Sequence, residues 1–287
     1  MRIDAHQHFW DLDRFSYPWM PREPSPLRRN YLPPELRPIL ANNRFEGSVV
    51  VQATTSAKEA RWLLDLADEY DFIRAVVGWV DLTAPDLPQH LDGLQAHPKF
   101  RGVRHPVHDE EDDRWLLRKD VIHGLRELER RDLCFDLLLR PRHLAIIPRL
   151  VERLPKLRMA IDHLAKPPIA EGRMDGWAED LERIADLAQV YVKISGLITE
   201  ADHQNWKAPH LKPFVQHAYR VFGPDRLMFG SDWPVCLQAG GWKEVLAAFT
   251  QTLGPLPTDT RLRMLGGTAI EFYGIKPGEG EVPETGD

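Results

Sequence analysis

The sequence predicts a single-domain α/β protein built as a closed (β/α)8 barrel of the TIM type. Short segments rich in β-branched and apolar residues recur eight times along its 287 residues, with helix-like stretches between them. Segments such as GSVVVQA and RAVVGWV are continuously apolar, which is typical of parallel strands covered by helices. Eight such units in a chain of this length favour a closed barrel over an open sheet. We expect the barrel to occupy residues 1–275.

The predicted strands follow one another along almost the whole chain. They are 3–9, 47–52, 73–80, 100–105, 133–139, 157–163, 190–195 and 227–231. Between strands, apolar residues spaced three and four apart give several stretches one apolar face to lay on a sheet. The clearest sets are Leu63, Leu66, Ala67 and Tyr70; Leu181, Ile184, Ala185 and Ala188; and Leu211, Phe214, Val215, Ala218 and Phe222.

The connection after the first strand is unusually long. Residues 10–34 are rich in proline and in aromatic side chains such as Phe15, Tyr17 and Trp19. Because long loops in compact domains are commonly lids or binding walls, we expect this one to border a ligand site. Residues 276–287 are rich in glycine, proline and glutamate, and we expect them to form a disordered tail.

Composition narrows the class of partner and the compartment. With 43% hydrophobic and 28% charged residues, the chain is predicted to be soluble and globular. A net charge of −6 without a dense Lys/Arg stripe argues against nucleic acid or an anionic membrane, so we expect a small-molecule partner. We interpret Cys134 and Cys236 as reduced core residues, and the absence of a leader-like segment predicts a cytoplasmic protein. The oligomeric state stays open.

The first strand carries a pair of histidines. The segment DAHQHFW places His6 and His8 two residues apart, so both side chains point to the same face of the strand. Two imidazoles that converge inside the barrel suit one metal ion. The alternative, that both histidines only make hydrogen bonds in the core, stays open on this motif alone.

Two further strands end in ionisable residues. His163 ends the sixth strand, in AIDHLAKPP, and Asp232 follows the eighth, in MFGSDWPV. Active sites of such barrels lie at the carboxyl ends of the strands, and a buried carboxylate there needs a partner. Asp232 could instead cap a helix, but the next convincing helix begins only near residue 241. Closure of the barrel would therefore gather His6, His8, His163 and Asp232 in one cluster.

These motifs resemble a known family. The segments DAHQHFW, GVRH, IDHLAKP, VKISGL, GSDWPV and GGTAIEFYGI resemble the amidohydrolase superfamily, and the resemblance covers residues 1–275. Within it they are similar to the branch of sugar-lactone hydrolases such as fuconolactonases and rhamnonolactonases. The resemblance implies that His6, His8 and Asp232 bind one divalent metal ion, usually zinc. It also implies that Asp232 takes the proton of the attacking water.

The chain departs from the family pattern on two strands. The fourth reads FRGVRH, with Arg104 and His105 where two-metal relatives carry a bridging carboxylated lysine. The fifth, LCFDLLLR, lacks the histidine ligand of many one-metal relatives, and Asp136 comes too early to replace it. We therefore expect at most one metal ion, with metal-independent catalysis as the alternative.

The function predicted is hydrolysis of a small aldono-lactone. In the predicted mechanism Asp232 activates water, and either a bound cation or Arg104 and His105 polarise the carbonyl. The leaving oxygen is protonated by Asp232, His163 or His105. A metal-dependent, non-oxidative decarboxylase is the runner-up, and the missing fifth-strand histidine disfavours it. A sugar-binding protein with a decayed site is a third hypothesis, disfavoured because a binder needs no such convergence of ionisable groups.

Candidate substrate-binding residues lie at or near the strand ends and in the long loop. Three tryptophans there could stack on a sugar ring or simply plug the barrel, and the sequence predicts a mixture of both roles. A lysine in VKIS could pair with a core carboxylate or hold a substrate oxygen. The candidates are Trp10, Arg22, Gln52, Trp79, Lys193 and Trp233.

Overall fold

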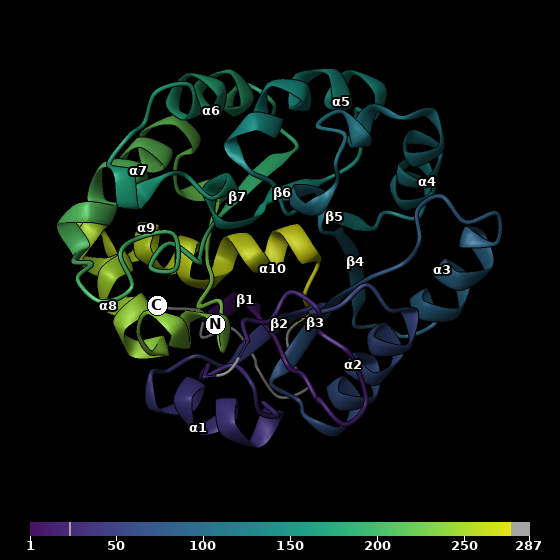
Figure 1. The fold of residues 1–287 in the computed structure, drawn as a ribbon, viewed down its shortest axis with the longest axis horizontal. Coiled ribbons are helices and arrows are strands. Elements are labelled where there is room, and N and C mark those ends of the chain that lie inside the picture. Colours follow the sequence, from purple (N-terminus) through teal and green to yellow (C-terminus); the bar gives the residue numbers. More distant parts are fainter. Residues whose placement is uncertain (23, 277–287) are drawn as a thin grey trace, which may run out of the picture.

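The computed structural model describes residues 1–22 and 24–276 and contains one eight-stranded parallel sheet ringed by helices (Figure 1). Each strand pairs with the next one in the sequence, from β1 to β8. The strands are β1 Ile3–Gln7, β2 Gly47–Val51, β3 Ile73–Gly78, β4 Phe100–His105, β5 Cys134–Leu137, β6 Met159–Ile161, β7 Val190–Ile194 and β8 Leu227–Phe229. The predicted barrel fold and its eight strands are confirmed. The predicted tail lies outside the described residues, except for Lys276.

Helices cover the outside of the sheet. They are α1 Pro33–Asn42, α2 Ala57–Glu69, α3 Leu87–Gln95, α4 Lys119–Arg130, α5 Ile147–Arg153, α6 Trp177–Ala185, α7 Ala208–Phe222, α8 Trp242–Leu253, α9 Thr258–Leu262 and α10 Thr268–Tyr273. The three apolar faces predicted from the sequence belong to α2, α6 and α7, and most of their residues are buried or half-buried. Tyr70 and Ala188, the last residues of the first two sets, lie beyond the ends of α2 and α6. The helix expected near residue 241 is α8.

The first and last strands close the barrel through the segments that follow them. Gln7 and Trp233 form an isolated parallel bridge, and the N–H of His8 donates to the Trp233 carbonyl at 2.7 Å. The N–H of Asp232 donates to the carbonyl of His6 at 2.8 Å. The backbone that closes the barrel is therefore the backbone that carries the candidate metal ligands.

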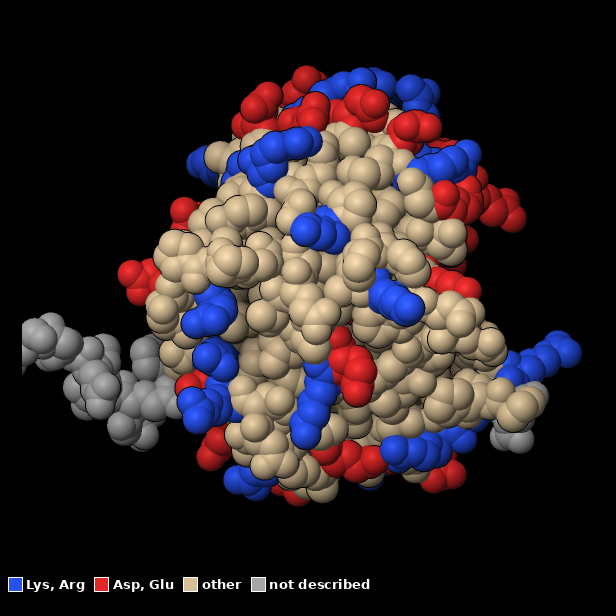
Figure 2. All heavy atoms as spheres, turned by 90° about the vertical axis from the view of Figure 1, so that its left-hand side faces the viewer, with Lys and Arg blue, Asp and Glu red and all other residues tan. Residues whose placement is uncertain are grey.

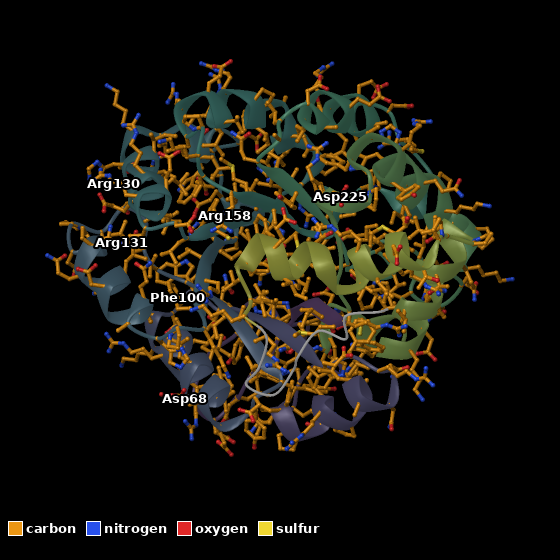
Figure 3. The ribbon with its side chains drawn as sticks, turned by 180° about the vertical axis from the view of Figure 1, so that it is seen from behind. Asp68, Phe100, Arg130, Arg131, Arg158 and Asp225 are labelled. Carbon is orange, nitrogen blue, oxygen red and sulfur yellow. The ribbon has the colours of Figure 1, made fainter. Side chains whose placement is uncertain are left out.

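The C-terminal helix α10 crosses the end of the barrel at which the strands begin (Figure 1). Phe272 and Tyr273 pack there against a layer of buried side chains from inside the barrel. Arg158 lies beside α10 in the view from behind (Figure 3), and its guanidinium donates to the carbonyls of Phe272 and Asp132. In the described part of the chain, α10 therefore plugs this end of the barrel and leaves the opposite end, where the strands finish, for a ligand site.

The surface charges and the two cysteines can be compared with what the composition predicts. On the side that carries α7 and α8, basic and acidic side chains are interspersed and no dense basic stripe is present (Figure 2). Cys134 and Cys236 are both buried and unpaired, which confirms their predicted place in the core. Among the described residues, no helix is long and apolar enough to cross a membrane.

Candidate active site

A cavity of about 360 Å³ opens at the carboxyl ends of the strands. Its wall combines apolar side chains with ionisable ones from segments that follow β1, β4, β6 and β8. The polar members of the wall include His8, Gln52, Arg104, His163, Lys166 and Asp232. The site therefore lies where barrel enzymes place theirs.

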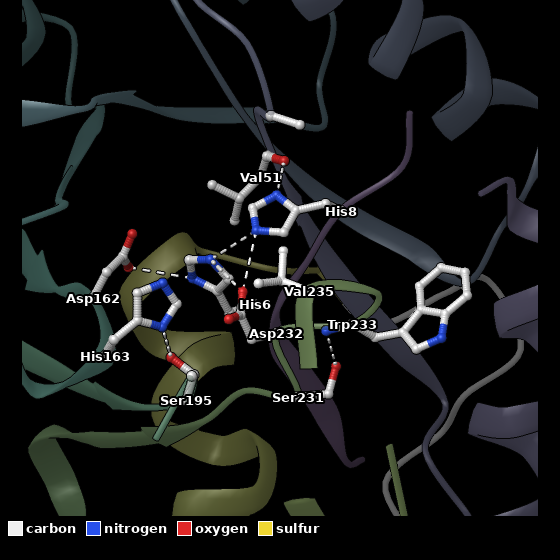
Figure 4. A network of polar contacts seen from close by, with 12 residues as sticks. His6, His8, Val51, Asp162, His163, Ser195, Ser231, Asp232, Trp233 and Val235 are labelled. Atoms are coloured by element: carbon white, nitrogen blue, oxygen red, sulfur yellow. Dashed lines mark hydrogen bonds and ion pairs between the residues drawn. The ribbon is translucent and has the colours of Figure 1, made fainter. Parts of the chain in front are cut away.

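Two of these ionisable groups, His8 and Asp232, converge with the buried His6 behind the wall (Figure 4). Nε2 of His8 lies 3.2 Å from Nε2 of His6 and 3.3 Å from Oδ1 of Asp232, and the His6 nitrogen lies 3.7 Å from the same oxygen. Nδ1 of His8 is 2.7 Å from the carbonyl oxygen of Val51. A carbonyl can only accept, so Nδ1 carries the hydrogen and Nε2 presents its lone pair to the cluster.

The cluster fits a divalent metal ion. Its candidate ligand atoms lie within 4.8 Å of one another, and all three residues are buried. Two imidazole nitrogens and one carboxylate oxygen are donors that zinc accepts, and three protein ligands leave a position for water or substrate. Burial holds the pKa of His6 well below its ordinary value, so the imidazole is neutral, as a ligand must be.

Beneath this cluster lies a buried ammonium group. Nζ of Lys193 is 2.5 Å from Oδ2 of Asp136, 3.0 Å from Oδ1 of Asp162 and 3.1 Å from Nδ1 of His6. Lys193 is fully buried and does not line the cavity. The structure thus places it as an ion-pair partner of core carboxylates, one of the two roles that the sequence left open.

The same lysine bears on the number of metal ions. A second set of possible ligands, from His6, Asp162 and His163, also lies within 4.8 Å. Burial disfavours the charge of Asp162, but Lys193, His6 and Arg104 together hold its pKa well below the usual range. Because the Lys193 ammonium and the Arg104 guanidinium already compensate the charge of Asp162, the electrostatics favour one metal ion over two.

Asp232 is held ionised. Burial opposes its charge, but the neighbouring imidazoles of His163, His8 and His6 outweigh burial and put its pKa below the ordinary range. Its backbone is left-handed, with a φ of 57°. Helix α8 begins ten residues further on, with Gly241 as its N-cap, so Asp232 does not cap it. The carboxylate is free to accept a proton.

An unusual turn delivers His163 and Lys166 to the cavity. His163, Leu164, Ala165 and Lys166 all have left-handed backbones, with φ between 53° and 59°. Consecutive left-handed residues other than glycine are costly, so surrounding contacts must hold them. The N–H of Lys166 donates to the His163 carbonyl at 2.8 Å, and Nε1 of Trp177 donates to the Leu164 carbonyl at 2.7 Å.

His163 sits against the segment that follows β7. Its Nδ1 is 2.9 Å from Oγ of Ser195, and burial lowers its pKa to about 4, so the ring is neutral at neutral pH. Gly196 has a φ of +61°, and a Cβ there would lie 2.5 Å from Nδ1 of His163 and 3.0 Å from Oδ2 of Asp232. Only glycine leaves room for both groups.

Arg104 and His105 point to different sides of β4. NH1 of Arg104 donates to Oδ2 of Asp162 at 3.2 Å, NH2 donates to the Gln52 carbonyl at 2.5 Å, and the side chain lines the cavity. His105 instead contacts Oε1 of Glu110 at 2.7 Å, outside the cavity wall. The prediction that both residues polarise one carbonyl needs correction, because consecutive strand residues face opposite ways.

The partners of His105 form a packed aromatic group. Its ring stacks on Trp115 with centroids 4.1 Å apart, and Nε1 of Trp79 donates to its Nδ1 at 3.2 Å. Trp79 therefore binds a protein side chain at the barrel rim and is not part of the cavity wall. Neither His105 nor Trp79 is placed to contact a ligand bound beside Asp232.

The remaining predicted binding residues also divide into those that line the cavity and those that do not. Trp10 is fully buried, with its ring 5.3 Å from that of Tyr31, and Trp233 packs on the other side of Tyr31, also at 5.3 Å. Both tryptophans plug the core, because the chain folds inward after β1 and β8. Arg22 lines a separate hollow of about 860 Å³ in the long loop. Gln52 alone of this group lines the cavity.

The cavity wall also contains residues that were not among the predicted site residues, and three of them carry an indole, an imidazole or an ammonium group. Trp19 reaches the cavity from the long loop, His108 follows β4, and Lys166 ends the left-handed turn after β6. His108 and Lys166 lie just beyond strand ends, a position that could have marked them. The position of Trp19 depends on the path of the loop, for which the sequence carries no periodic signal.

The comparisons with known proteins agree with this geometry. A family model described as amidohydrolase matches residues 3–275. The chain is 38% identical to an L-fucono-1,5-lactonase of Burkholderia ambifaria, with 98% of each chain covered, and 36% identical to one of Burkholderia multivorans, with 96% of each covered. An amidohydrolase of Burkholderia multivorans, crystallised with bound zinc, superimposes with a TM-score of 0.91 at 36% identity, covering 96% of this chain and 100% of that one. The chain belongs to the amidohydrolase family.

Proposed function

We propose that this protein hydrolyses a small sugar lactone, an aldono-lactone of five or six carbons, with Asp232 as the base. The observation that carries the proposal is the convergence of Asp232, His6 and His8 at a cavity in a chain so similar to L-fucono-1,5-lactonases. A cavity of about 360 Å³ is of the size that small-molecule sites have. Deoxy-sugar lactones of the fucose or rhamnose kind are the proposed substrates.

Asp232 provides the base in the proposed mechanism. A divalent ion held by His6, His8 and Asp232 would supply Lewis-acid polarisation and lower the pKa of water. As the water oxygen bonds to the lactone carbonyl carbon, the Asp232 carboxylate accepts the water proton. The carboxylate is ionised at neutral pH before the substrate arrives, so it can accept this proton.

Arg104 is the proposed stabiliser of the oxyanion. It lies on the cavity wall, and its Nε is buried without a hydrogen-bond partner among the described residues. A fixed cation on the cavity wall stabilises negative charge on the carbonyl oxygen as that charge develops. Because Asp162 and the Gln52 carbonyl hold the other two nitrogens, the guanidinium is already oriented before substrate binds.

The proton for the leaving ring oxygen is proposed to come from Asp232. When the tetrahedral centre collapses, the C–O bond of the ring breaks and the oxygen takes up the proton that Asp232 accepted. His163 has its pKa lowered to about 4, which makes it a neutral hydrogen-bond partner and a poor acid. His105 contacts Glu110 and does not line the cavity. Its position therefore does not support a role as proton donor to the ring oxygen.

Substrate recognition is assigned to the polar and aromatic parts of the wall. Gln52, His108 and Lys166 offer groups that can bind ring hydroxyls, and Trp19 offers an aromatic face for the C–H side of a sugar ring. Trp10, Trp233 and Lys193 are omitted because packing or ion pairs occupy them. The decarboxylase alternative gains no support from β5, since Lys193 and Tyr273 bind Asp136.

Replacement of Asp232 by asparagine tests the base. Asp232→Asn is expected to lower kcat on an aldono-lactone by at least about 10²-fold with the fold intact, because the amide cannot accept the water proton. Asp68→Asn, which alters a surface pair with His97, is the control and is expected to keep wild-type kcat. Turnover of Asp232→Asn within a few-fold of wild type would remove Asp232 from this role.

A further inference from the structure

One buried carboxyl group lies outside the catalytic cluster and has an unusual set of partners. Glu59 is fully buried in the first turn of α2. With Ser56 it forms the pattern Ser-x-x-Glu, and Oγ of Ser56 accepts the Glu59 N–H at 3.4 Å. In a capping box the glutamate would bind the N–H of Ser56. That N–H is instead donated to the Thr54 carbonyl at 2.9 Å.

The Glu59 carboxyl reaches past its own helix to the segment after β2. The N–H of Ala53 lies 3.2 Å from Oε1 and 3.1 Å from Oε2, and the N–H of Thr54 lies 3.2 Å from Oε2. Ala53 and Thr54 both line the cavity. Glu59 thus holds a stretch of the cavity wall by its backbone without touching the cavity itself.

The same stretch of wall carries part of the long loop, residues 16–19, here called the cover segment. Nε1 of Trp19 donates to the Ala53 carbonyl at 2.6 Å, and Oγ1 of Thr54 donates to the carbonyl of Ser16 at 2.9 Å. Trp19 lines the cavity and remains 41% exposed, so it forms part of the cavity's outer edge. The Ala53 residue is therefore bound on one side by Glu59 and on the other by the cover segment.

The Tyr17 hydroxyl, also in the cover segment, completes the surroundings of Glu59. It hydrogen-bonds the carboxyl, and the positive charge of Arg104 acts on the same group to lower its pKa. A fully buried carboxyl that only capped a helix would gain little from reaching into a second segment, because burial of such a group is costly. All the contacts of this carboxyl lead to the cavity wall or to its cover.

We propose that Glu59 is a positioning residue for substrate binding: it fixes Ala53 and Thr54 and, through them, holds the cover segment at the mouth of the cavity. The inference rests on the proposed lactonase function for its kinetic consequence. Its structural consequence is independent of any activity. Without Glu59, substrate binding weakens while the chemical step at Asp232 is unaffected.

The test compares two glutamates that both accept pairs of backbone N–H groups. Glu59→Leu removes the acceptors at similar volume and leaves two N–H groups unpaired. Glu129→Leu does the same far from the cavity, where Oε1 accepts the N–H groups of Lys156 and Leu157 at 2.8 and 3.1 Å. Steady-state rates on an aldono-lactone and amide hydrogen exchange of residues 11–22 are measured for both variants and wild type.

For Glu59→Leu, KM is expected to rise by about tenfold, because the loss of one or two buried hydrogen bonds has an effect of that size. The kcat of this variant is expected to stay within about twofold of wild type. Exchange of residues 11–22 is expected to accelerate in this variant only. Glu59→Gln, which keeps one carbonyl acceptor, is expected to restore part of the affinity. KM and exchange equal to those of Glu129→Leu would overturn the proposal, as would a loss of kcat at unchanged KM.

Two further outcomes are decided by separate measurements. If Glu59→Leu does not fold, Thr54→Val removes the bond to Ser16 with Glu59 in place, and unchanged exchange of residues 11–22 in that variant overturns the proposal. If the wild-type protein opens no lactone, the lactonase proposal fails. Exchange then still decides whether Glu59 holds the cover segment, because that measurement needs no substrate.

Discussion

Single atoms decide the shape of the catalytic cluster. Gly196 has a left-handed backbone and lies so close to His163 and Asp232 that a Cβ would meet both. Its neighbour Ser195 fixes the His163 ring through Nδ1. The positions of the proposed base and of its neutral neighbour therefore depend on the absence of one methyl group. This residue is a sharper probe of the geometry than the ligands themselves, since its replacement alters no ionisable group.

The substitution Gly196→Ala is expected to lower kcat on an aldono-lactone by about 10²-fold or more, because a displacement of about 1 Å in a catalytic group has that cost. Gly172→Ala is the matched control: Gly172 also has a positive φ, of +64°, but a Cβ there meets nothing within 4 Å. Both variants place alanine at a positive φ and are strained there, but only in Gly196→Ala does the Cβ collide with His163 and Asp232. Equal activity of the two variants would show that the cluster tolerates the methyl group.

At the scale of elements, the segments after the strands build the site by pairing with one another. The cover segment packs on the segment after β2, which is held by Glu59 at the start of α2. Burial raises the pKa of Glu59 to about 8, against opposing contributions from the Thr54 and Ala53 N–H groups and from Arg104. The folded state thus holds this proton more tightly than the unfolded chain, in which the pKa is about 4.5.

This difference gives the free energy of unfolding a pH dependence of known sign. Between about pH 4.5 and 8 the folded state binds the Glu59 proton and the unfolded state does not, so the stability contributed by Glu59 falls as pH rises. Glu59→Gln has no proton to lose. The free energy of unfolding of both proteins is measured by urea titration at several pH values. The difference, Glu59→Gln minus wild type, is expected to increase by at least about 1 kcal/mol between pH 5 and 8. A difference that stays constant over that range would contradict the raised pKa.

At the scale of the whole molecule, the candidate metal ligands come from the first and the last strand regions of the barrel. His6 lies in β1 and His8 just after it, Asp232 follows β8, and the hydrogen bonds that close the barrel run between these segments. A metal ion bound there joins the first strand to the last. Because it binds the folded state alone, it stabilises the closed barrel by mass action.

Elemental analysis of the purified protein is expected to find at most one divalent ion per chain. Added zinc is expected to raise the Tm of the chelated protein by at least a few degrees, since about 100-fold excess over Kd contributes about 2.7 kcal/mol. His8→Asn should remove this shift. Two tightly held ions would contradict the single-site account, and full activity of the metal-free protein would make the cluster a hydrogen-bonding site.

Much of this arrangement could be predicted from the sequence because it follows from periodicity. Strand alternation put His6 and His8 on one face, and the rule that barrel sites lie at the carboxyl ends of strands located His163 and Asp232. The same alternation separates Arg104 from His105.

What escaped prediction depends on contacts between distant segments. The ion pairs of Lys193 with Asp136 and Asp162 join three strands, and no local pattern specifies them. The burial of Trp10 and the place of Trp19 on the cavity wall follow from the path of a long loop. Such a path is set by tertiary packing alone, so the sequence predicted that the loop borders a ligand site but not which of its side chains line the cavity.

The most direct test of the account is a side-by-side rate measurement on candidate substrates with wild-type protein and Asp232→Asn. A pH indicator follows the acid released from aldono-lactones, with fucono- and rhamnono-lactones first among them, and carbon dioxide release is followed from aromatic carboxylic acids. We expect the lactones to be opened faster than phosphotriesters, hydantoins or aryl acids, and Asp232→Asn to lose that activity. If no aldono-lactone is hydrolysed above the buffer rate while an aromatic acid loses carbon dioxide, the lactonase proposal is wrong and a decarboxylase replaces it.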